Sequence, residues 1–375
     1  MDFESYIGQL QASGNYRSVP ADRSGDPVVD FSTNDYLGLG MRIDLQRQFF
    51  ARDGMCDVPL TSSASRLLAA TQNHYNALEA RLGELYGRDI LIFNSGYHAN
   101  TGIIPALTDS STLIVADKLV HASIIDGMML SKCRFTRFRH NDFDHLEQIL
   151  ARAGAEAANC LVVVESVYSM DGDSADMERL IEIKRRFPQI LLYVDEAHAF
   201  GVCGKSGLGL AASSSQSDAF DVIVGTFGKA AASMGAFCAV SAALRDVIVN
   251  RARSFIFSTA LPPLNAAWTL FMVDRIVGMD TEREHLRQLS AALNRVISPY
   301  SPAGTVPGHI QPLVVGDARR AVELSRRLET EGFKALPIRT PTVPPGTERL
   351  RFSLSASMDA ATVCRLGDAL EHLMK

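Results

Sequence analysis

Residues 221–230 read DVIVGTFGKA, an apolar run followed by small residues and a lysine, Lys229. The uninterrupted apolar residues predict the end of a buried strand. Lysine is rarely buried without a partner, so a position directly after such a strand is unusual for a surface charge. Desolvation lowers the pKa of an amine and makes it a usable nucleophile. We therefore interpret Lys229 as a candidate for covalent catalysis.

A second predicted strand, upstream of the first, ends in an acid. Residues 191–198 read LLYVDEAH, which places Asp195 at the end of an apolar run and His198 three residues later. The order strand–Asp–x–x–His, then strand–Lys, is expected of enzymes that use pyridoxal 5'-phosphate (PLP). The lysine holds the aldehyde carbon, and the carboxylate faces the pyridinium nitrogen. The alternative for each residue alone is structural: Asp195 caps a helix, and Lys229 pairs with an acid.

Similar apolar runs recur through the middle of the chain, at residues 89–93, 111–116, 160–165, 190–194 and 221–224. Continuous apolar runs, without polar alternation, are typical of strands that helices cover on both faces. Helical patterns occupy residues 73–86 and 177–186. We therefore expect an α/β fold with a mostly parallel central sheet in a large domain.

The pattern changes after residues 261–263, which read LPP. A helical stretch from about residue 264 to 296, broken near Gly278, comes first. The elements expected beyond it are strand 310–315, helix 318–331, strand 334–338, strand 349–354 and helix 360–374. We predict an N-terminal arm (1–40), a large PLP-binding domain (41–275) and a small C-terminal α+β domain (276–375).

The bulk properties argue against several classes of protein. The chain has 375 residues and a net charge of −5, so no broad basic field favours nucleic acid. The six cysteines form no C-x-x-C pair and no metal-like spacing, so we expect buried free thiols, a reducing compartment and no metal. The N-terminus is acidic, and no apolar run approaches the roughly 20 residues that span a bilayer. We expect a cytoplasmic protein without a membrane partner.

Two further segments follow predicted strands and are candidates for ligand binding. Ser95-Gly96-Tyr97 lies between strand 89–93 and a helical pattern. Such a turn offers backbone N–H groups and a helix dipole to a phosphate; the alternative is a simple helix cap. His121 follows strand 111–116, at the strand end where ligands bind in open α/β sheets. Its imidazole could stack on a cofactor ring and shuttle protons; the alternative is a structural histidine.

Residues 349–354 read RLRFSL and begin by alternating charged with apolar side chains. A period of two places Arg349 and Arg351 on one face of a strand. A guanidinium group at that position suits the carboxylate of a substrate. The alternative is a pair of solvated arginines on an edge strand.

The sequence resembles the α-oxoamine synthases, PLP enzymes of fold type I with an aspartate aminotransferase-like fold. The similar segments run from about residue 34 to the C-terminus and are highly specific in combination: Asn34–Leu39, Ser95–Tyr97, Asp117–Ser123, Ser169–Asp173, Asp195–His198, Thr226–Lys229 and Ser258–Thr259. Members of this family condense an amino acid with an acyl thioester and release CO2. The resemblance implies a PLP-dependent C-acyltransferase that works as a homodimer with its sites at the interface.

The resemblance also implies roles for individual residues around the cofactor. Lys229 is implied to form the covalent link to PLP and later to take the α-proton. Asp195 is implied to pair with the pyridine nitrogen, and His121 to stack on the ring. His198 and Ser169 are implied to lie near the phenolic oxygen of the cofactor.

Other matched residues are implied to hold the cofactor phosphate or the substrate. Those implied to hold the cofactor are Ser95, Gly96, Tyr97 and Thr226. Ser258 and Thr259 are implied to reach a phosphate across the dimer interface. Arg351 is implied to bind the amino-acid carboxylate, with Asn34 nearby.

Two C-terminal stretches, 310–317 and 341–351, are most similar to the branch of the family that condenses L-alanine with a pimeloyl thioester in biotin synthesis. The carrier of the acyl group, coenzyme A or acyl carrier protein, stays open. The amino acid stays open as well, because one methyl group is worth only about 1–3 kcal/mol of discrimination. One alternative is a glycine-using sibling, such as 2-amino-3-oxobutyrate CoA ligase or 5-aminolevulinate synthase; another is a lyase or aminotransferase on the same fold.

The chain departs from the usual family pattern in a somewhat short N-terminal arm and in two segments further along. Residues 61–66 read TSSASR where the family usually carries a glycine-rich segment, and Ala232 stands where a glycine is usual. Side chains therefore replace flexible backbone in segments that line or support the substrate region. A further alternative that residues 61–66 leave open is a dimerising paralogue without activity.

Overall fold

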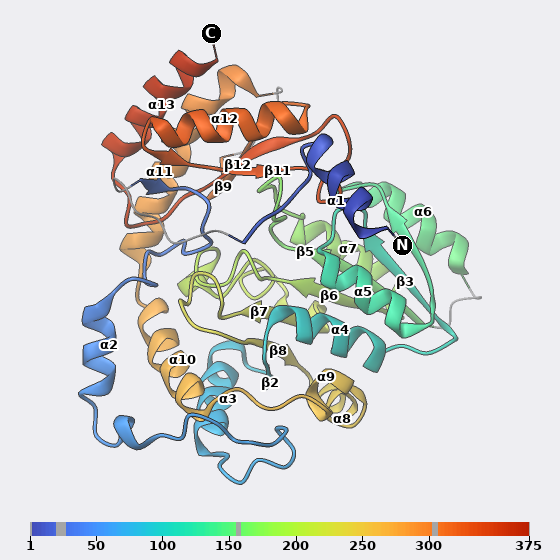
Figure 1. Cartoon of the computed structure of the whole chain (residues 1–375). Helices are drawn as coiled ribbons and strands as arrows, with labels where there is room; N and C mark the ends of the chain where they lie inside the picture. Colours follow the sequence, from blue (N-terminus) through green and yellow to red (C-terminus); the bar gives the residue numbers. More distant parts are fainter. Residues whose placement is uncertain (1, 20–27, 155–158, 302–306, 375) are drawn as a thin grey trace. The chain divides into compact units, whose positions relative to one another are not determined.

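The computed structural model describes residues 2–19, 28–154, 159–301 and 307–374. The chain divides into two compact units, and Figure 1 traces it through both. The larger unit contains Leu37–Tyr168 and Ser174–Asp280. The smaller unit contains Met1–Tyr36, Thr281–Lys375 and the short segment Ser169–Asp173, which interrupts the larger unit in sequence.

The larger unit is built on a seven-stranded sheet with the order β2-β8-β7-β6-β5-β3-β4. Its strands are β2 (Asp89–Phe93), β3 (Thr112–Asp117), β4 (Arg134–Phe138), β5 (Asn159–Glu165), β6 (Ile190–Asp195), β7 (Val222–Thr226) and β8 (Ala236–Val240). Neighbouring strands are parallel, except that β8 is antiparallel to both β2 and β7. The mostly parallel α/β sheet expected from the sequence is therefore confirmed.

Two strands of this sheet, β4 and β8, were not predicted from the sequence. β4 reads RFTRF and is an edge strand with mostly exposed residues, so it lacks the continuous apolar run that marks its neighbours. β8 reads AFCAV and is fully buried. Periodicity alone does not distinguish so short an apolar run from a buried piece of helix.

The helices of the larger unit are α2 (Ile43–Phe50), α3 (Asn73–Tyr86), α4 (Gly96–Ala106), α5 (Ala122–Ser131), α6 (Phe143–Ala153), α7 (Met177–Arg186), α8 (Ala242–Arg251), α9 (Arg253–Ile256) and α10 (Pro263–Ile276). α4 and α5 lie side by side (Figure 1) and share a core with the sheet that contains Ile103, Ile124 and Val224. Full burial of one such side chain contributes about 1.5–3 kcal/mol. This packing fixes the first residues of α4 and α5, where several candidate site residues stand.

The smaller unit contains an antiparallel sheet in the order β11-β12-β9 and a parallel pair, β1 with β10. Its elements are α1 (Phe3–Ala12), β1 (Val29–Asp30), α11 (Asp280–Ile297), β9 (Ile310–Val314), α12 (Ala318–Thr330), β10 (Phe333–Lys334), β11 (Leu336–Ile338), β12 (Arg349–Ser353) and α13 (Ala360–Leu373). β12 is the central strand of its sheet. Arg349 and Arg351 therefore do not lie on an edge strand.

Three general features complete the fold. No helix in the described part of the chain is long and apolar enough to cross a membrane. Nor do the His, Cys, Asp and Glu side chains of the residues described gather in a group that could hold a metal ion. The cysteines are free, but Cys56 and Cys364 are exposed, so the expectation of buried thiols is wrong for these two.

Candidate active site

Lys229 lies in the loop that connects β7 to β8. Hydrogen bonds from Phe227 N to Gly235 O (2.9 Å) and from Ala232 N to Lys229 O (3.0 Å) close this loop. Because β8 runs antiparallel to β7, the chain reverses after the lysine and keeps it at the carboxyl end of the parallel strands. The side chain is half-buried, and its Nζ lies 2.7 Å from Nε2 of His198. The lysine and the histidine of the sequence motif are thus in contact.

The turn after Lys229 contains Ala232, which stands where the family usually has a glycine, and its backbone conformation shows why glycine is favoured there. Ala232 has a φ of +46°, a left-handed conformation that glycine adopts without steric cost. For a residue with a Cβ atom this conformation costs about 1–2 kcal/mol. Nε1 of Trp268 donates a hydrogen bond of 3.1 Å to Ala232 O and helps to hold the turn. The loop therefore carries backbone strain three residues from the functional lysine.

Asp195 ends β6 with a side chain that is only 4% exposed. Ala197 N donates to Oδ1 (2.9 Å), and Asn100 Nδ2 donates to Oδ2 (2.7 Å). Both donors are neutral, so these two hydrogen bonds bring no positive charge to the carboxyl group. Burial of a carboxylate charge is costly, which favours the binding of a cationic group here. Residues 197–200 form a turn, so Asp195 is not the cap of a helix.

Two further buried carboxyl groups lie next to Asp195. Glu165 is its neighbour in β5, and burial, followed by repulsion from Asp195, raises the pKa of Glu165 well above its usual value. Burial also raises the pKa of Glu196 to about 7, although hydrogen bonds from Ser166 and from Ala211 N oppose this shift. Both glutamates therefore hold a proton at a higher pH than a solvated glutamate does.

The first turn of α4 can hold an anion. Ser95 caps this helix by accepting a hydrogen bond of 3.2 Å from His98 N, and Gly96 is the first helical residue. A Cβ atom placed on Gly96 would lie 3.9 Å from Cβ of Thr226, so the two residues are neighbours. The N–H groups at a helix start, together with the helix dipole, form a common binding site for phosphate.

The residues at this edge of the sheet fit PLP by the chemistry of their donors. Lys229 supplies a primary amine, Asp195 a buried carboxylate, and His121 an imidazole at the start of α5. The start of α4 supplies N–H groups for a phosphate. These groups follow β7, β6, β3 and β2, all at the carboxyl ends of strands that run in one direction. This is the edge at which open α/β sheets bind their ligands.

The smaller unit brings together Arg351, Asn34 and Ser169, three other residues predicted from the sequence. Arg351 is 4% exposed; its Nε donates to Ser169 O (2.6 Å), and its Nη2 donates to Asn34 Oδ1 (3.0 Å). Arg349 is also buried and forms an ion pair with Asp171. Both arginines thus face the segment Ser169–Asp173, and the alternative of two solvated side chains is wrong.

Ser258 and Thr259 follow α9 and pair with the serine-rich segment. Thr259 forms an antiparallel bridge with Ser65, and its carbonyl accepts a hydrogen bond of 2.6 Å from Asn94 Nδ2. Thr259 is exposed, and Ser258 is half-buried. Ser65 belongs to the segment that replaces the usual glycine-rich stretch. Its backbone pairing with Thr259 therefore fixes this segment next to Ser258 and Thr259.

Tyr97, in the first turn of α4, is 48% exposed. Its hydroxyl group donates a hydrogen bond to the carboxylate of Asp126 in α5. This contact raises the pKa of Tyr97 above its usual value. The tyrosine therefore links the starts of the two packed helices and keeps its ring accessible.

Three buried polar residues around His121 and Asp195 were missed in the sequence. Asn100 Nδ2 lies 2.9 Å from Ser123 Oγ, which in turn lies 2.8 Å from His121 Nδ1. Tyr193 OH donates to Asn100 Oδ1 (2.5 Å). All three residues are at most 1% exposed. Each of them is a polar residue inside an otherwise apolar helix or strand, and this pattern could have indicated a buried hydrogen bond. The sequence does not show which partner such a residue contacts.

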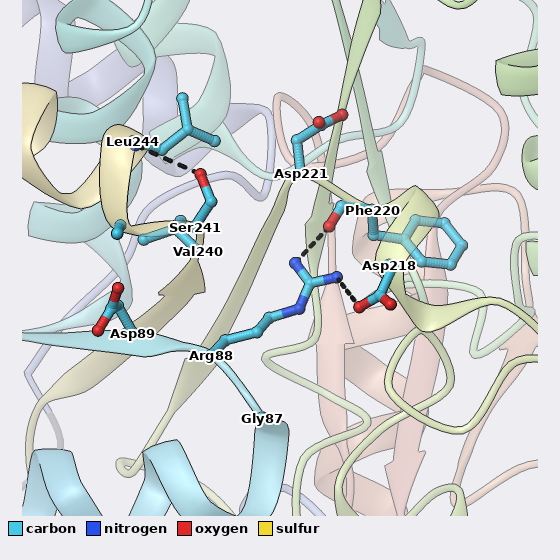
Figure 2. Close-up of a pocket in the computed structure, with 10 residues that line it drawn as sticks. Gly87, Arg88, Asp89, Asp218, Phe220, Asp221, Val240, Ser241 and Leu244 are labelled. Carbon is cyan, nitrogen blue, oxygen red and sulfur yellow. Dashed lines mark hydrogen bonds and ion pairs between the residues drawn. The ribbon is translucent and has the colours of Figure 1, made fainter.

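A cavity of about 580 Å³ lies at the opposite end of the sheet, beside the amino ends of β2 and β7 (Figure 2). Arg88 points into it and donates a hydrogen bond to the carbonyl group of Phe220. It also donates to Ser217 O and forms an ion pair with Asp218. Ser241 caps α8 there by accepting from Leu244 N. These polar groups are already engaged with the protein itself, so the cavity does not offer a catalytic constellation.

The sequence model of the aminotransferase class I and II family matches residues 26–370. The chain belongs to this family. Within it, the chain is 45% identical over 381 residues to a protein of Pasteurella multocida named "Putative 8-amino-7-oxononanoate synthase". That alignment covers 99% of this chain and 98% of the relative.

Solved structures of family members have the same fold. A serine palmitoyltransferase from S. paucimobilis with bound PLP is 25% identical, with a TM-score of 0.88 over 99% of this chain and 97% of the other. An 8-amino-7-oxononanoate synthase from Francisella tularensis is 25% identical, with a TM-score of 0.77 over 92% and 96%. The chain is thus a PLP-dependent enzyme of fold type I, an α-oxoamine synthase, as the resemblance of its motifs implied.

Proposed function

We propose that this family member condenses L-alanine with a pimeloyl thioester, releases CO2 and forms 8-amino-7-oxononanoate for biotin synthesis. The observation that carries the choice of substrates is the 45% identity, over 99% of the chain, to a relative that bears this product's name. The acyl carrier is coenzyme A or acyl carrier protein. The reaction is effectively irreversible because CO2 leaves.

The geometry around Lys229 supports amino-acid chemistry. When bound, PLP supplies an aldehyde for a primary amine and a ring that withdraws electrons from the α-carbon of the amino acid. Lys229 Nζ then removes the α-proton and later returns a proton to the product. His198, whose Nε2 lies 2.7 Å from Nζ, holds the lysine in place between these transfers. The carboxyl group of Asp195 would face the cationic ring nitrogen.

The cofactor phosphate is proposed to bind at the start of α4, with Ser95, Gly96 and Thr226 around it. Tyr97 adds an accessible ring at the same helix start. We further propose that the enzyme is a homodimer in the cytoplasm. Ser258 and Thr259, which the pairing with Ser65 holds at the surface, would then serve the phosphate of the other subunit.

Arg351 is proposed to bind the carboxylate of the amino acid. Its Nε and Nη2 are held by Ser169 O and Asn34 Oδ1, which fixes the plane of the guanidinium group. Nη1 makes no hydrogen bond to any of the described residues, so its two N–H groups are available to a carboxylate. Ser169 and Asn34 thus position the arginine through the smaller unit alone.

The substrates are tested with purified, PLP-loaded enzyme. L-alanine, glycine and L-serine are each combined with pimeloyl-CoA and with pimeloyl-acyl carrier protein, and product mass and CO2 release are measured. We expect the highest kcat/KM for L-alanine, with 8-amino-7-oxononanoate as product. Preference for glycine would contradict the proposal and indicate a sibling synthase. Amino-acid turnover without a thioester would indicate a lyase or aminotransferase.

The role of Arg351 is tested by comparing two buried arginines of the same strand. Arg351→Ala is expected to raise the KM for L-alanine by about 30- to 100-fold, the loss of a charge-assisted hydrogen-bond pair. Arg349→Ala removes an ion pair to Asp171 and is expected to lower stability without this change in KM. Equal KM values in the two variants would contradict the assignment.

A further inference from the structure

The imidazole of His121 is the N-cap of α5. The backbone N–H of Ser123 donates to its Nδ1 at 3.2 Å, as a serine or aspartate oxygen does at other helix starts. A backbone N–H can only donate, so Nδ1 must accept and carries no proton. A proton on this nitrogen would face the N–H of Ser123 and break the cap.

A series of hydrogen bonds that begins at Asp195 brings a second donor, the hydroxyl group of Ser123, to Nδ1 of His121. The carboxylate only accepts hydrogen bonds, so the atom of Asn100 that faces it at 2.7 Å is the amide nitrogen. The second hydrogen of that nitrogen points to Ser123 Oγ at 2.9 Å. Ser123 Oγ thereby accepts from Asn100, and its own hydrogen remains to be donated to the imidazole.

Tyr193 completes the chain by fixing the amide of Asn100 from its other side. Its hydroxyl group donates to Oδ1 of the amide, which cannot flip without placing this oxygen against the carboxylate of Asp195. Asn100, Ser123 and Tyr193 are at most 1% exposed, so water does not substitute for any of these contacts. Because Asp195 can only accept, it determines the direction of each following hydrogen bond in this series, from Asn100 to His121.

We propose that Asn100 and Ser123 are positioning residues, which fix the imidazole of His121 as the neutral tautomer with its proton on Nε2. A neutral imidazole leaves the charge of Asp195 to the cationic ring nitrogen of PLP. A cationic imidazole would compete for that charge and repel the ring. The two residues act on the cofactor only through Asp195 and His121.

The charged groups around His121 come from four other positions in the larger unit. Burial has the largest effect and lowers the pKa of His121; Lys229, after β7, acts in the same direction. Asp195 from β6 and Asp126 from α5 oppose it. Glu165 from β5 accepts a hydrogen bond from His121 N, and burial raises the pKa of this glutamate well above its usual value. The electrostatic balance therefore agrees with the tautomer that the hydrogen bonds require.

The tautomer is measured by two-bond ¹H–¹⁵N NMR of the ¹⁵N-histidine-labelled enzyme, with and without PLP, and the His121→Gln variant assigns the signal. In the unaltered enzyme we expect the pattern of a neutral ring with its proton on Nε2 from pH 6.5 to 8. A proton on Nδ1, or a cationic ring at neutral pH, would overturn the proposal. This readout is independent of the substrates, so it stands or falls separately from the proposed reaction.

Two variants test the chain itself. Asn100→Asp removes both amide donors, so the hydrogen of Ser123 Oγ is no longer directed to the imidazole, and His121 should gain a proton at higher pH than in the unaltered enzyme. Ser123→Ala removes one donor and should let His121 gain its proton at higher pH, with PLP bound about five- to tenfold more weakly. Ser254→Ala, which removes a hydroxyl that donates to His98 O in α4, is the matched control without either change. Unchanged ¹⁵N signals in both test variants would refute the relay.

Discussion

The two ends of the large sheet carry similar polar residues but use them differently. At the amino ends of β2 and β7, Arg88 donates to two carbonyl groups, and Asp221 accepts from Lys184 Nζ (2.9 Å) and Leu192 N (2.7 Å). At the carboxyl ends, Asp195 accepts only from neutral donors. A cavity lined by mutually satisfied groups lies at the first end, and a buried carboxylate with neutral hydrogen-bond donors lies at the second.

This difference teaches that a cavity by itself does not mark the functional end of the sheet, whereas a buried carboxyl group held by neutral donors points to it. The cavity of about 580 Å³ is lined by groups that stabilise the fold by satisfying one another. Around Asp195, the two hydrogen-bond donors are neutral, and such donors offset the cost of burying a carboxylate only in part. In the role proposed for Asp195, a bound cofactor with a cationic nitrogen would offset the rest of this cost.

The largest effect is expected when the lysine at each end is removed. Lys229→Ala should lower turnover by about 10³-fold or more, because the proton-transferring amine is lost, with little change in stability. Lys184→Ala, at the other end, should lower the free energy of unfolding by about 1–3 kcal/mol, because it leaves Asp221 without its cation. Turnover and urea unfolding are measured on both variants. Normal turnover of Lys229→Ala would contradict the assignment of the active site.

A second effect comes from the proton that Glu196 holds at the carboxyl end. Its pKa is 4.5 in the unfolded chain and about 7 in the folded one. The folded state therefore binds the proton more tightly, and this contribution to stability is present below pH 4.5 and is lost as pH rises to about 7. The expected slope is about 1.4 kcal/mol per pH unit, or about 3 kcal/mol in total.

The contribution of Glu196 is isolated by the variant Glu196→Gln, which cannot ionise. Urea unfolding of both proteins between pH 4.5 and 8 gives the difference in stability at each pH. We expect the unaltered protein to lose stability relative to the variant as pH rises. A difference that is constant over this range would show that Glu196 is ionised in the folded protein.

A third effect tests the amino end, where the arginine satisfies carbonyl groups. Arg88→Ala leaves Phe220 O and Ser217 O without their donor and should cost about 2 kcal/mol of stability. Turnover per folded molecule should stay unchanged, because nothing at this end takes part in the reaction. Thermal unfolding and kcat measure the two quantities. A fall in kcat with intact stability would assign a functional role to the cavity.

The smallest effect concerns the strained turn beside Lys229. Ala232→Gly should raise the free energy of unfolding by about 0.5–1 kcal/mol, because glycine adopts a φ of +46° without steric cost. Ala231→Gly, at the buried neighbouring position, should lower it by a similar amount. Urea unfolding followed by the fluorescence of Trp268, which contacts the turn, measures both. A loss of stability in both variants would show that the turn is not strained.

Much of this protein was determined by the sequence alone. The strands β2, β3, β5, β6 and β7 were predicted because continuous apolar runs are a local signal. Lys229 and Asp195 were found because each follows such a run directly. The alternation in residues 349–354 correctly placed two arginines on one face of a strand, although it did not show that the strand is central and buried.

Only the tertiary structure decided which polar groups meet. Asn100 contacts Asp195 and Ser123, and Arg351 contacts Asn34 and Ser169, across long separations in the chain. A local pattern cannot encode such pairs, because each depends on the packing of several elements that are distant in sequence. The proton positions around His121 depend on these same contacts. The sequence therefore determined which chemistry the chain carries, and the fold decided how its hydrogen bonds are directed.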